Sequence, residues 1–260
     1  MNMKKTLIAL AVAASAAVSG SAMAWKEGGT GNSVNIGGSL TPVEKVNPWE
    51  VKTGDAVTGL DAQIKKGQNV VDITVEQAIP VLGIRSKTET FNGRAGIKPQ
   101  IDYRGVVNFT GSKGMAPVTL EVFDNSSKRI GSLQTTLTGI AVYSTSGGGE
   151  TPNYGGLGAS TSNDSFFGGV GGVSSVPNYS DSVAILNGIS NEYLEKYTKQ
   201  SNGVERPGSM LFGNPAISYS AAYGSGITKG QVIKITLDQG AAGDAPIAWK
   251  ASLPVTVRYQ

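Results

Sequence analysis

The chain has 260 residues and a formal net charge of +3, and glycine is its commonest residue, with 36 copies. It contains no histidine and no cysteine, which excludes a Ser-His-Asp triad, a cysteine nucleophile, disulfides and ordinary zinc sites. Lysine and arginine number 22 against 19 acidic residues, so no dense cationic surface for nucleic acid is expected, and nothing suggests a metal or a cofactor.

Residues 1–24 have the features of a secretory signal peptide. Two lysines precede the apolar run TLIALAVAASAAV, and the following SGSAMA ends in an Ala-x-Ala-like exit site. The apolar run is too short to span the roughly 30 Å hydrocarbon core of a bilayer, which disfavours a membrane anchor. The sequence therefore predicts export and a mature chain that starts at Trp25. Removing the two lysines lowers the formal charge to +1.

The mature chain begins with a predicted strand that has no obvious partner. In GNSVNIGGSLTP, alternate residues place Val34, Ile36, Gly38 and Leu40 on one face. The glycine-rich KEGGTGN before this segment leaves it free to swing away from its own domain.

The central part of the chain is typical of short strands joined by turns, because its apolar residues recur mainly at spacing two. The clearest runs are 70–75, 79–85, 106–110, 118–123, 217–223, 232–237 and 253–259. This pattern predicts an all-β sandwich or barrel.

The alternation breaks within residues 145–215, which we interpret as an insertion of loop and helix on the all-β frame. Its first part is rich in glycine, serine and asparagine. A helix is then predicted, capped by Asp181 or Ser182 and stopped by Gly203. The apolar residues at three-to-four spacing that indicate this helix are Val183, Leu186, Ile189, Tyr193, Leu194 and Tyr197.

Without histidine or cysteine, hydrolysis would require paired carboxylates. Glu192 and Glu195 share one face of the predicted helix, and Asp72 and Glu76 are close in sequence. A glycosidase pair must face a cleft at roughly 5–10 Å separation, and 19 scattered acids produce such pairs by chance. Solvated surface positions are therefore favoured over an active site.

The C-terminal strand also lacks an obvious partner. Leu253, Val255, Val257 and Tyr259 alternate up to the end of the chain, and no later segment covers the edge. Proteins usually protect such apolar edges, because they aggregate. A spare strand at one end and an open edge at the other suggest strand addition between copies, in which backbone hydrogen bonds supply affinity and alternate side chains fill pockets.

Several segments resemble the kappa-class (Fae-type) subunits of enterobacterial chaperone–usher fimbriae. They are the signal peptide, Trp25 and the stretches NSVNIGGSLT, PWEVKTG, ISYSAAYGSGITKGQVIKITL and IAWKASLPVTVRY. The resemblance covers residues 1–60 and 215–260 and extends through the middle strands. The absence of cysteine fits it as well. Residues 145–215 carry no receptor-binding motif of that family, so no lectin residue is transferred from it.

The resemblance implies an incomplete immunoglobulin-like sandwich, residues 43–260, that lacks its last strand and carries the insertion. The extension 25–42 of one subunit would complete the next, with Val34, Ile36, Gly38 and Leu40 as donor residues. A periplasmic chaperone would first lend a strand, facing Leu253, Val255, Val257 and Tyr259, and an outer-membrane usher would assemble the fibre. Identical or homologous subunits are the expected partners, and the subunit would be exported through the periplasm to a surface fimbria.

A sugar site is predicted in the first part of the insertion, because sugar sites combine aromatic platforms with polar groups on loops. The candidate residues are Asn153, Tyr154, Asn163, Asp164, Phe166, Phe167 and Tyr179. Phe166 and Phe167 are better explained as a cover for the following helix, whereas Asn153 and Tyr154, between Pro152 and two glycines, are expected to be exposed. Host glycans are the corresponding ligands.

Two other readings stay open. A secreted β-sandwich lectin or glycosidase would need a fold that is complete in itself. An outer-membrane barrel would normally end in an aromatic residue and carry aromatic girdles, whereas this chain ends in Gln260 and has 7% aromatic residues. We expect a fimbrial structural subunit that contributes to adhesion, either the main subunit or a minor one, and no enzyme.

Overall fold

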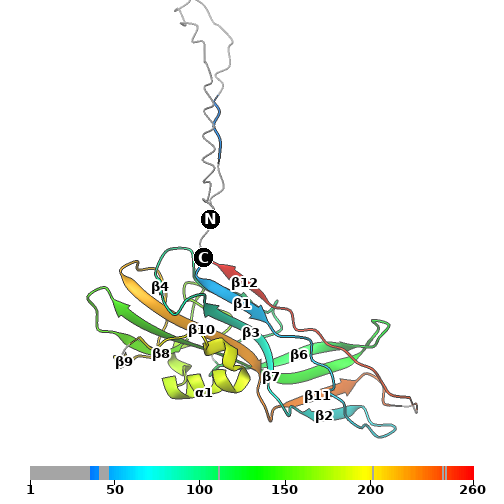
Figure 1. Ribbon diagram of the computed structural model, residues 1–260. Helices are drawn as coiled ribbons and strands as arrows, with labels where there is room; N and C mark the ends of the chain where they lie inside the picture. Colours follow the sequence, from blue (N-terminus) through cyan, green and yellow to red (C-terminus); the bar gives the residue numbers. More distant parts are fainter. Residues whose placement is uncertain (1–35, 41–46, 111, 201, 242, 244) are drawn as a thin grey trace, which may run out of the picture. The chain divides into compact units, whose positions relative to one another are not determined.

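A computed structural model describes residues 36–40, 47–110, 112–200, 202–241, 243 and 245–260 (Figure 1). The chain divides into two units, residues 1–45 and 46–260. In the first unit, residues 36–40 have no regular secondary structure, and the side chains of Ile36 and Leu40 are 94% and 99% exposed. The predicted signal peptide and most of the predicted donor segment, including Val34, lie outside the described residues.

The second unit is mostly β with one α-helix among its described residues. Its strands are β1 (Trp49–Thr53), β2 (Val70–Thr74), β3 (Ile79–Ser86), β4 (Phe91–Asn92), β5 (Pro99–Asp102), β6 (Met115–Phe123), β7 (Arg129–Gly147), β8 (Asn153–Leu157), β9 (Val204–Glu205), β10 (Ile217–Ile227), β11 (Val232–Leu237) and β12 (Thr256–Tyr259). The helices are α1 (Tyr179–Ile189) and two 3₁₀ turns, η1 (Val173–Ser175) and η2 (Asn191–Leu194).

Ten of these strands form one sheet, whose main path is β1-β3-β10-β7-β11-β2. Strands β5 and β12 form a separate antiparallel pair. The two sheets share one apolar cluster, in which Ile101 of β5 packs with Leu82 of β3 and Tyr223 of β10, and Val257 of β12 packs against it. The main core therefore lies between the long sheet and the β5–β12 pair.

Most of the strands predicted from alternation are confirmed, with ends that differ by a few residues. The prediction for 106–110 was wrong, since Val107 makes only an isolated bridge to Val118. In the C-terminal run only Thr256–Tyr259 is a regular strand, because Pro254, just before it, lacks an amide hydrogen for a ladder.

The longest strand, β7, was missed by sequence reasoning. Its first half pairs with β6 and β11, and its second half pairs with β10 and β8. Residues 137–145 are all buried, because one face of this stretch contacts the main core and the other lies under α1. Burial on both faces removes the alternation by which a strand is recognised.

The predicted helix is present, but it is shorter than expected and begins earlier. Asn178, rather than Asp181 or Ser182, is the N-cap, and its side chain accepts a hydrogen bond from the backbone N–H of Asp181. The α-helix ends at Ile189, because Ser190 is extended, with φ −161° and ψ 128°. Leu186, Ile189 and Tyr193 still pack in one buried cluster, since η2 continues the same apolar face.

A close contact between an aromatic ring of η2 and two glycines of the long sheet attaches the insertion to the sheet. Gly83 of β3 and Gly224 of β10 are register partners, and the ring of Tyr193 lies over them. A Cβ added at Gly224 would be 2.2 Å from Tyr193 Cδ2, and one at Gly83 would be 2.4 Å from Tyr193 Cε1. Only glycine at both positions admits the ring, so the absence of two side chains determines where η2 docks.

The two glutamates singled out in the sequence reinforce this contact. Arg85 Nη1 is 2.6 Å from Glu195 Oε2 and donates to the backbone oxygen of Glu192, and Lys52 Nζ is 2.7 Å from Glu192 Oε2. Lys52 and the two glutamates are about half exposed, and Arg85 is 25% exposed, so each ion pair is partly screened by water and contributes little. They hold η2 against β1 and β3, which supports the interpretation of Glu192 and Glu195 as surface residues rather than a catalytic pair.

Candidate functional site

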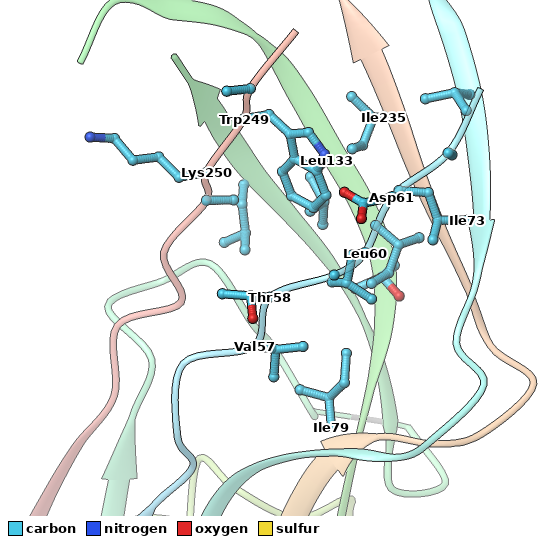
Figure 2. A pocket seen from close by; sticks show the side chains of 18 of the residues that line it. Val57, Thr58, Leu60, Asp61, Ile73, Ile79, Leu133, Ile235, Trp249 and Lys250 are labelled. Atoms are coloured by element: carbon cyan, nitrogen blue, oxygen red, sulfur yellow. The ribbon is translucent and has the colours of Figure 1, made fainter. Parts of the chain in front are cut away.

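The second unit contains an apolar groove of about 1580 Å³. Its floor is formed by side chains from the long sheet, and its two walls are residues 54–66 and 245–255. Figure 2 shows Leu60 and Trp249 directed from opposite walls toward Leu133 of β7 and Ile235 of β11. Lys250 points away from this space, so its ammonium group does not interrupt the apolar surface.

The groove walls are extended segments without strand partners along the groove. Gly54 donates to the backbone oxygen of Val81, and Phe123 exchanges two backbone hydrogen bonds with Lys250. Between these anchor points, within the described chain, no backbone hydrogen bond joins residues 55–64 or 251–255 to another segment. An unpaired backbone beside an apolar floor is the arrangement that an added strand can complete.

The C-terminal strand residues line or border this groove. Leu253 and Val255 contribute to its lining, whereas Val257 and Tyr259 lie in the β12–β5 pair. All four are half-buried and pack against the main core. Gln260 exchanges two backbone hydrogen bonds with Lys98, so it is held beside the start of β5.

The predicted sugar-site residues fall into two groups. Asn153 and Tyr154 are in β8, and Tyr179 is the first residue of α1. The rings of Tyr154 and Tyr179 meet edge to face with centroids 4.9 Å apart. Both rings are half-buried, and the Asn153 side-chain oxygen accepts a hydrogen bond from Thr145. Segments 25 residues apart in the chain therefore form one aromatic cluster.

Two residues that were not among the predicted sugar-site residues complete this cluster. Lys199 Nζ lies 3.8 Å from the centroid of the Tyr154 ring and 5.6 Å from that of Tyr179. Tyr197 donates a hydrogen bond to the backbone oxygen of Tyr143, and burial raises the pKa of its hydroxyl, which therefore stays protonated. No sequence pattern predicts this group, since the lysine lies in the irregular segment after η2.

The second group lies in the loop between β8 and η1. Phe166 is fully buried in the main core, stacked on Tyr223 at 5.6 Å, whereas Phe167 is half-buried. Partial burial would raise the pKa of Asp164, but hydrogen bonds from the backbone N–H groups of Thr161 and Ser160 hold it below its usual value. Asn163 is exposed, and its backbone oxygen accepts from Lys98.

The buried position of Phe166 explains an unusual backbone conformation. Its φ of +61° lies in the left-handed region that aromatic residues rarely adopt. The ring packs with Trp49, Phe212 and Tyr223, and this burial offsets the strain. Phe166 covers the core between the sheets rather than the helix.

Within the described ranges, no group of three or more acidic side chains is placed to hold a metal ion. Nor does any described helix have the length and apolarity needed to cross a bilayer.

The chain is similar to known fimbrial proteins along its whole length. A family model described as "Fimbrial, major and minor subunit", the K88 family, matches residues 3–260. The chain is 31% identical to the K88 fimbrial protein AD and 32% identical to the K88 fimbrial protein AC, both of Escherichia coli. It is 29% identical to the F41 fimbrial protein of the same organism. Each comparison covers 99% of this chain and 100% of the relative.

The family model matches nearly all residues, and the identities to the full-length K88 relatives exceed 30%. The fold of the described residues is mostly β. The resemblance seen in the sequence is thereby confirmed, including the cell-surface fimbria as the location. This chain belongs to the K88 family of fimbrial major and minor subunits, which are structural proteins and not enzymes.

Proposed function

We propose that this subunit polymerises by donor-strand exchange, with the apolar groove as the acceptor. Residues 43–260 then act as an incomplete immunoglobulin-like sandwich, and residues 25–42 of the neighbouring subunit supply the missing strand. The observation that carries the proposal is the groove itself, which combines an apolar floor with two walls whose backbone is unpaired.

The donor segment has the properties that this groove requires. Its apolar residues Val34, Ile36 and Leu40 alternate, so they can enter the groove together while the intervening side chains face solvent. Ile36 and Leu40 are almost fully exposed, and burying each would contribute about 1.5–3 kcal/mol. At about 3.3 Å per residue, residues 34–40 extend over roughly 20 Å, the length of an ordinary strand.

Before assembly the same groove needs a temporary occupant, because an open apolar groove favours aggregation. In this proposal a strand of a periplasmic chaperone lies beside residues 253–259, and an outer-membrane usher exchanges it for the next subunit's donor segment. A lectin or glycosidase that works as a monomer is disfavoured, since its own chain would have to complete the fold.

Deletion of residues 25–40 tests the proposal. Fibres should be lost while the chaperone still binds the subunit, because the acceptor groove stays intact. Electron microscopy of the cell surface and co-purification with the chaperone measure the two effects. Fusing residues 25–42 behind Gln260 in the deletion variant should yield a stable monomer by size-exclusion chromatography. Fibres of normal length from the deletion variant would rule out this mode of assembly.

We further propose that the fibre binds host glycans through the aromatic cluster. Tyr154 offers a half-exposed ring, Asn153 precedes it in β8 with a half-buried side chain, and weak sites repeated along a fibre gain avidity. The loop with Asn163, Asp164 and Phe167 is a second group of surface candidates, whereas the burial of Phe166 leaves it no surface for a ligand.

The variant Asn153→Ala with Tyr154→Ala should still form fibres but bind host glycans about tenfold or more weakly, since it loses the ring of Tyr154 as a stacking platform and the amide of Asn153. Glycan-array binding by purified fibres measures this, and Asn163→Ala tests the second group of candidates in the same assay. A wild-type array without any binding would instead identify a purely structural or minor subunit.

A further inference from the structure

The ammonium group of Lys199 lies over one face of the Tyr154 ring. Its nitrogen lies 3.8 Å from the Tyr154 centroid, well within the range of a cation–π contact. The lysine is exposed, while the two tyrosines are half-buried. A ligand can therefore stack on that face of Tyr154 only if the lysine side chain moves.

The rings are fixed more firmly than the lysine. The backbone N–H of Tyr179 donates to Glu205 Oε1 at 2.7 Å. Tyr154 lies in β8 and is paired with residues of both β7 and β9. Lys199 forms no ion pair in the described part of the chain, and its four-carbon stem is flexible. The cluster is thus a rigid aromatic surface with one mobile cation over it.

Neutral and anionic sugars would interact differently with this arrangement. The C–H groups of a sugar ring and an ammonium group are both attracted to the negative face of an aromatic ring, so they compete for Tyr154. A neutral sugar would displace the ammonium group from the Tyr154 ring into water and would offer it no charged partner in exchange. An anionic sugar displaces it too, but offers a carboxylate or sulfate with which the same ammonium group can pair.

The acidic side chains near the cluster are already engaged. Glu205 accepts the hydrogen bond from Tyr179, and Asp181 accepts one from the Asn178 side chain at 2.8 Å. Neither forms an ion pair with Lys199 within the described chain, so the ammonium charge is available to a ligand.

From these contacts we propose that the Tyr154–Tyr179–Lys199 cluster is a subsite for an anionic saccharide, with the sugar ring on Tyr154 and the carboxylate or sulfate group paired with Lys199. The inference rests on the glycan-binding part of the proposed function and is independent of the mode of polymerisation. Because lysine acts as a point charge, either anion satisfies the site.

Three immobilised probes test it, namely lactose, sialyl-lactose and sulfated lactose, each titrated with purified intact fibres. Wild-type fibres should bind at least one of the two anionic probes about threefold or more tightly than lactose, and the preference should shrink between about 0.05 and 0.5 M salt. Lys199→Gln should abolish the preference. Lys196→Gln, which removes an exposed lysine three residues earlier that makes neither ring contact, should leave it unchanged.

Electron microscopy of the same preparations records fibre formation separately. Fibres that bind lactose as tightly as both anionic probes, or a preference that survives Lys199→Gln, would overturn the anionic subsite while leaving adhesion and polymerisation in place. Fibres that bind none of the probes would overturn the subsite together with the glycan-binding proposal, and donor-strand exchange would be unaffected.

Discussion

Fibres are expected to be absent when Ile36 is replaced by aspartate. In the proposed assembly the Ile36 side chain of each subunit is buried in the groove of the next, whose floor includes Leu133 and Ile235. A carboxylate placed there without a partner costs several kcal/mol or must bind a proton. A loss of about 3 kcal/mol lowers the affinity at each junction by more than about 100-fold. Electron microscopy and fibre yield at neutral pH measure the effect.

The matched control is Ser39→Asp, which adds the same charge to the same segment on the alternate face. It should assemble normally, because that face points away from the groove. Chaperone binding should be preserved in both variants, since neither changes residues 46–260. Normal fibre yield from Ile36→Asp, or equal loss from both variants, would contradict the proposed burial of the alternate apolar residues.

The second large effect is expected at Gly224, where valine should destabilise the subunit by about 1–3 kcal/mol. The new Cβ would be 2.2 Å from Tyr193 Cδ2 and 2.8 Å from Leu186 Cδ2, so both η2 and α1 would be pushed from the sheet. Circular dichroism of purified fibres during heating should show a midpoint lower by roughly 4–10 °C.

Two further variants separate this clash from a general effect of removing glycine. Gly188→Ala lies in α1 with nothing within 4 Å of the added Cβ, and it should leave stability unchanged or raise it slightly. Combining Gly224→Val with Tyr193→Ala should be less harmful than the sum of the two single changes, because the ring is what the valine meets. Additive losses would show that the glycine–tyrosine contact does not position the insertion.

Local sequence patterns were informative wherever a segment buries a single face. Strands β2, β6 and β11 alternate because one side contacts apolar residues and the other meets solvent. The apolar spacing around α1 identified the face that packs on β7 and β10, although the helix itself ends at Ile189. The absence of histidine and cysteine likewise excluded whole classes of chemistry, because no other side chain supplies an imidazole or a thiolate.

Sequence patterns did not predict the structure where both faces of a strand are buried or where a residue has a strained backbone conformation. The second half of β7 lies between the core and α1, so its residues 137–145 show no alternation. Strand β8 pairs with β7 inside what the composition indicated to be an inserted loop. Phe166 adopts a positive φ because its ring fills the core, which no local propensity predicts.

Composition and residue spacing along the chain were enough to predict an exported, mostly β subunit of the fimbrial family with apolar alternation near its start and at its end. The positions of the groove and of the aromatic cluster depend on the folded chain. The groove joins residues 54–66 to residues 245–255, and the aromatic cluster joins Tyr154, Tyr179 and Lys199. Both depend on contacts between distant segments, which arise only when the strands pair and the insertion docks on the two glycines.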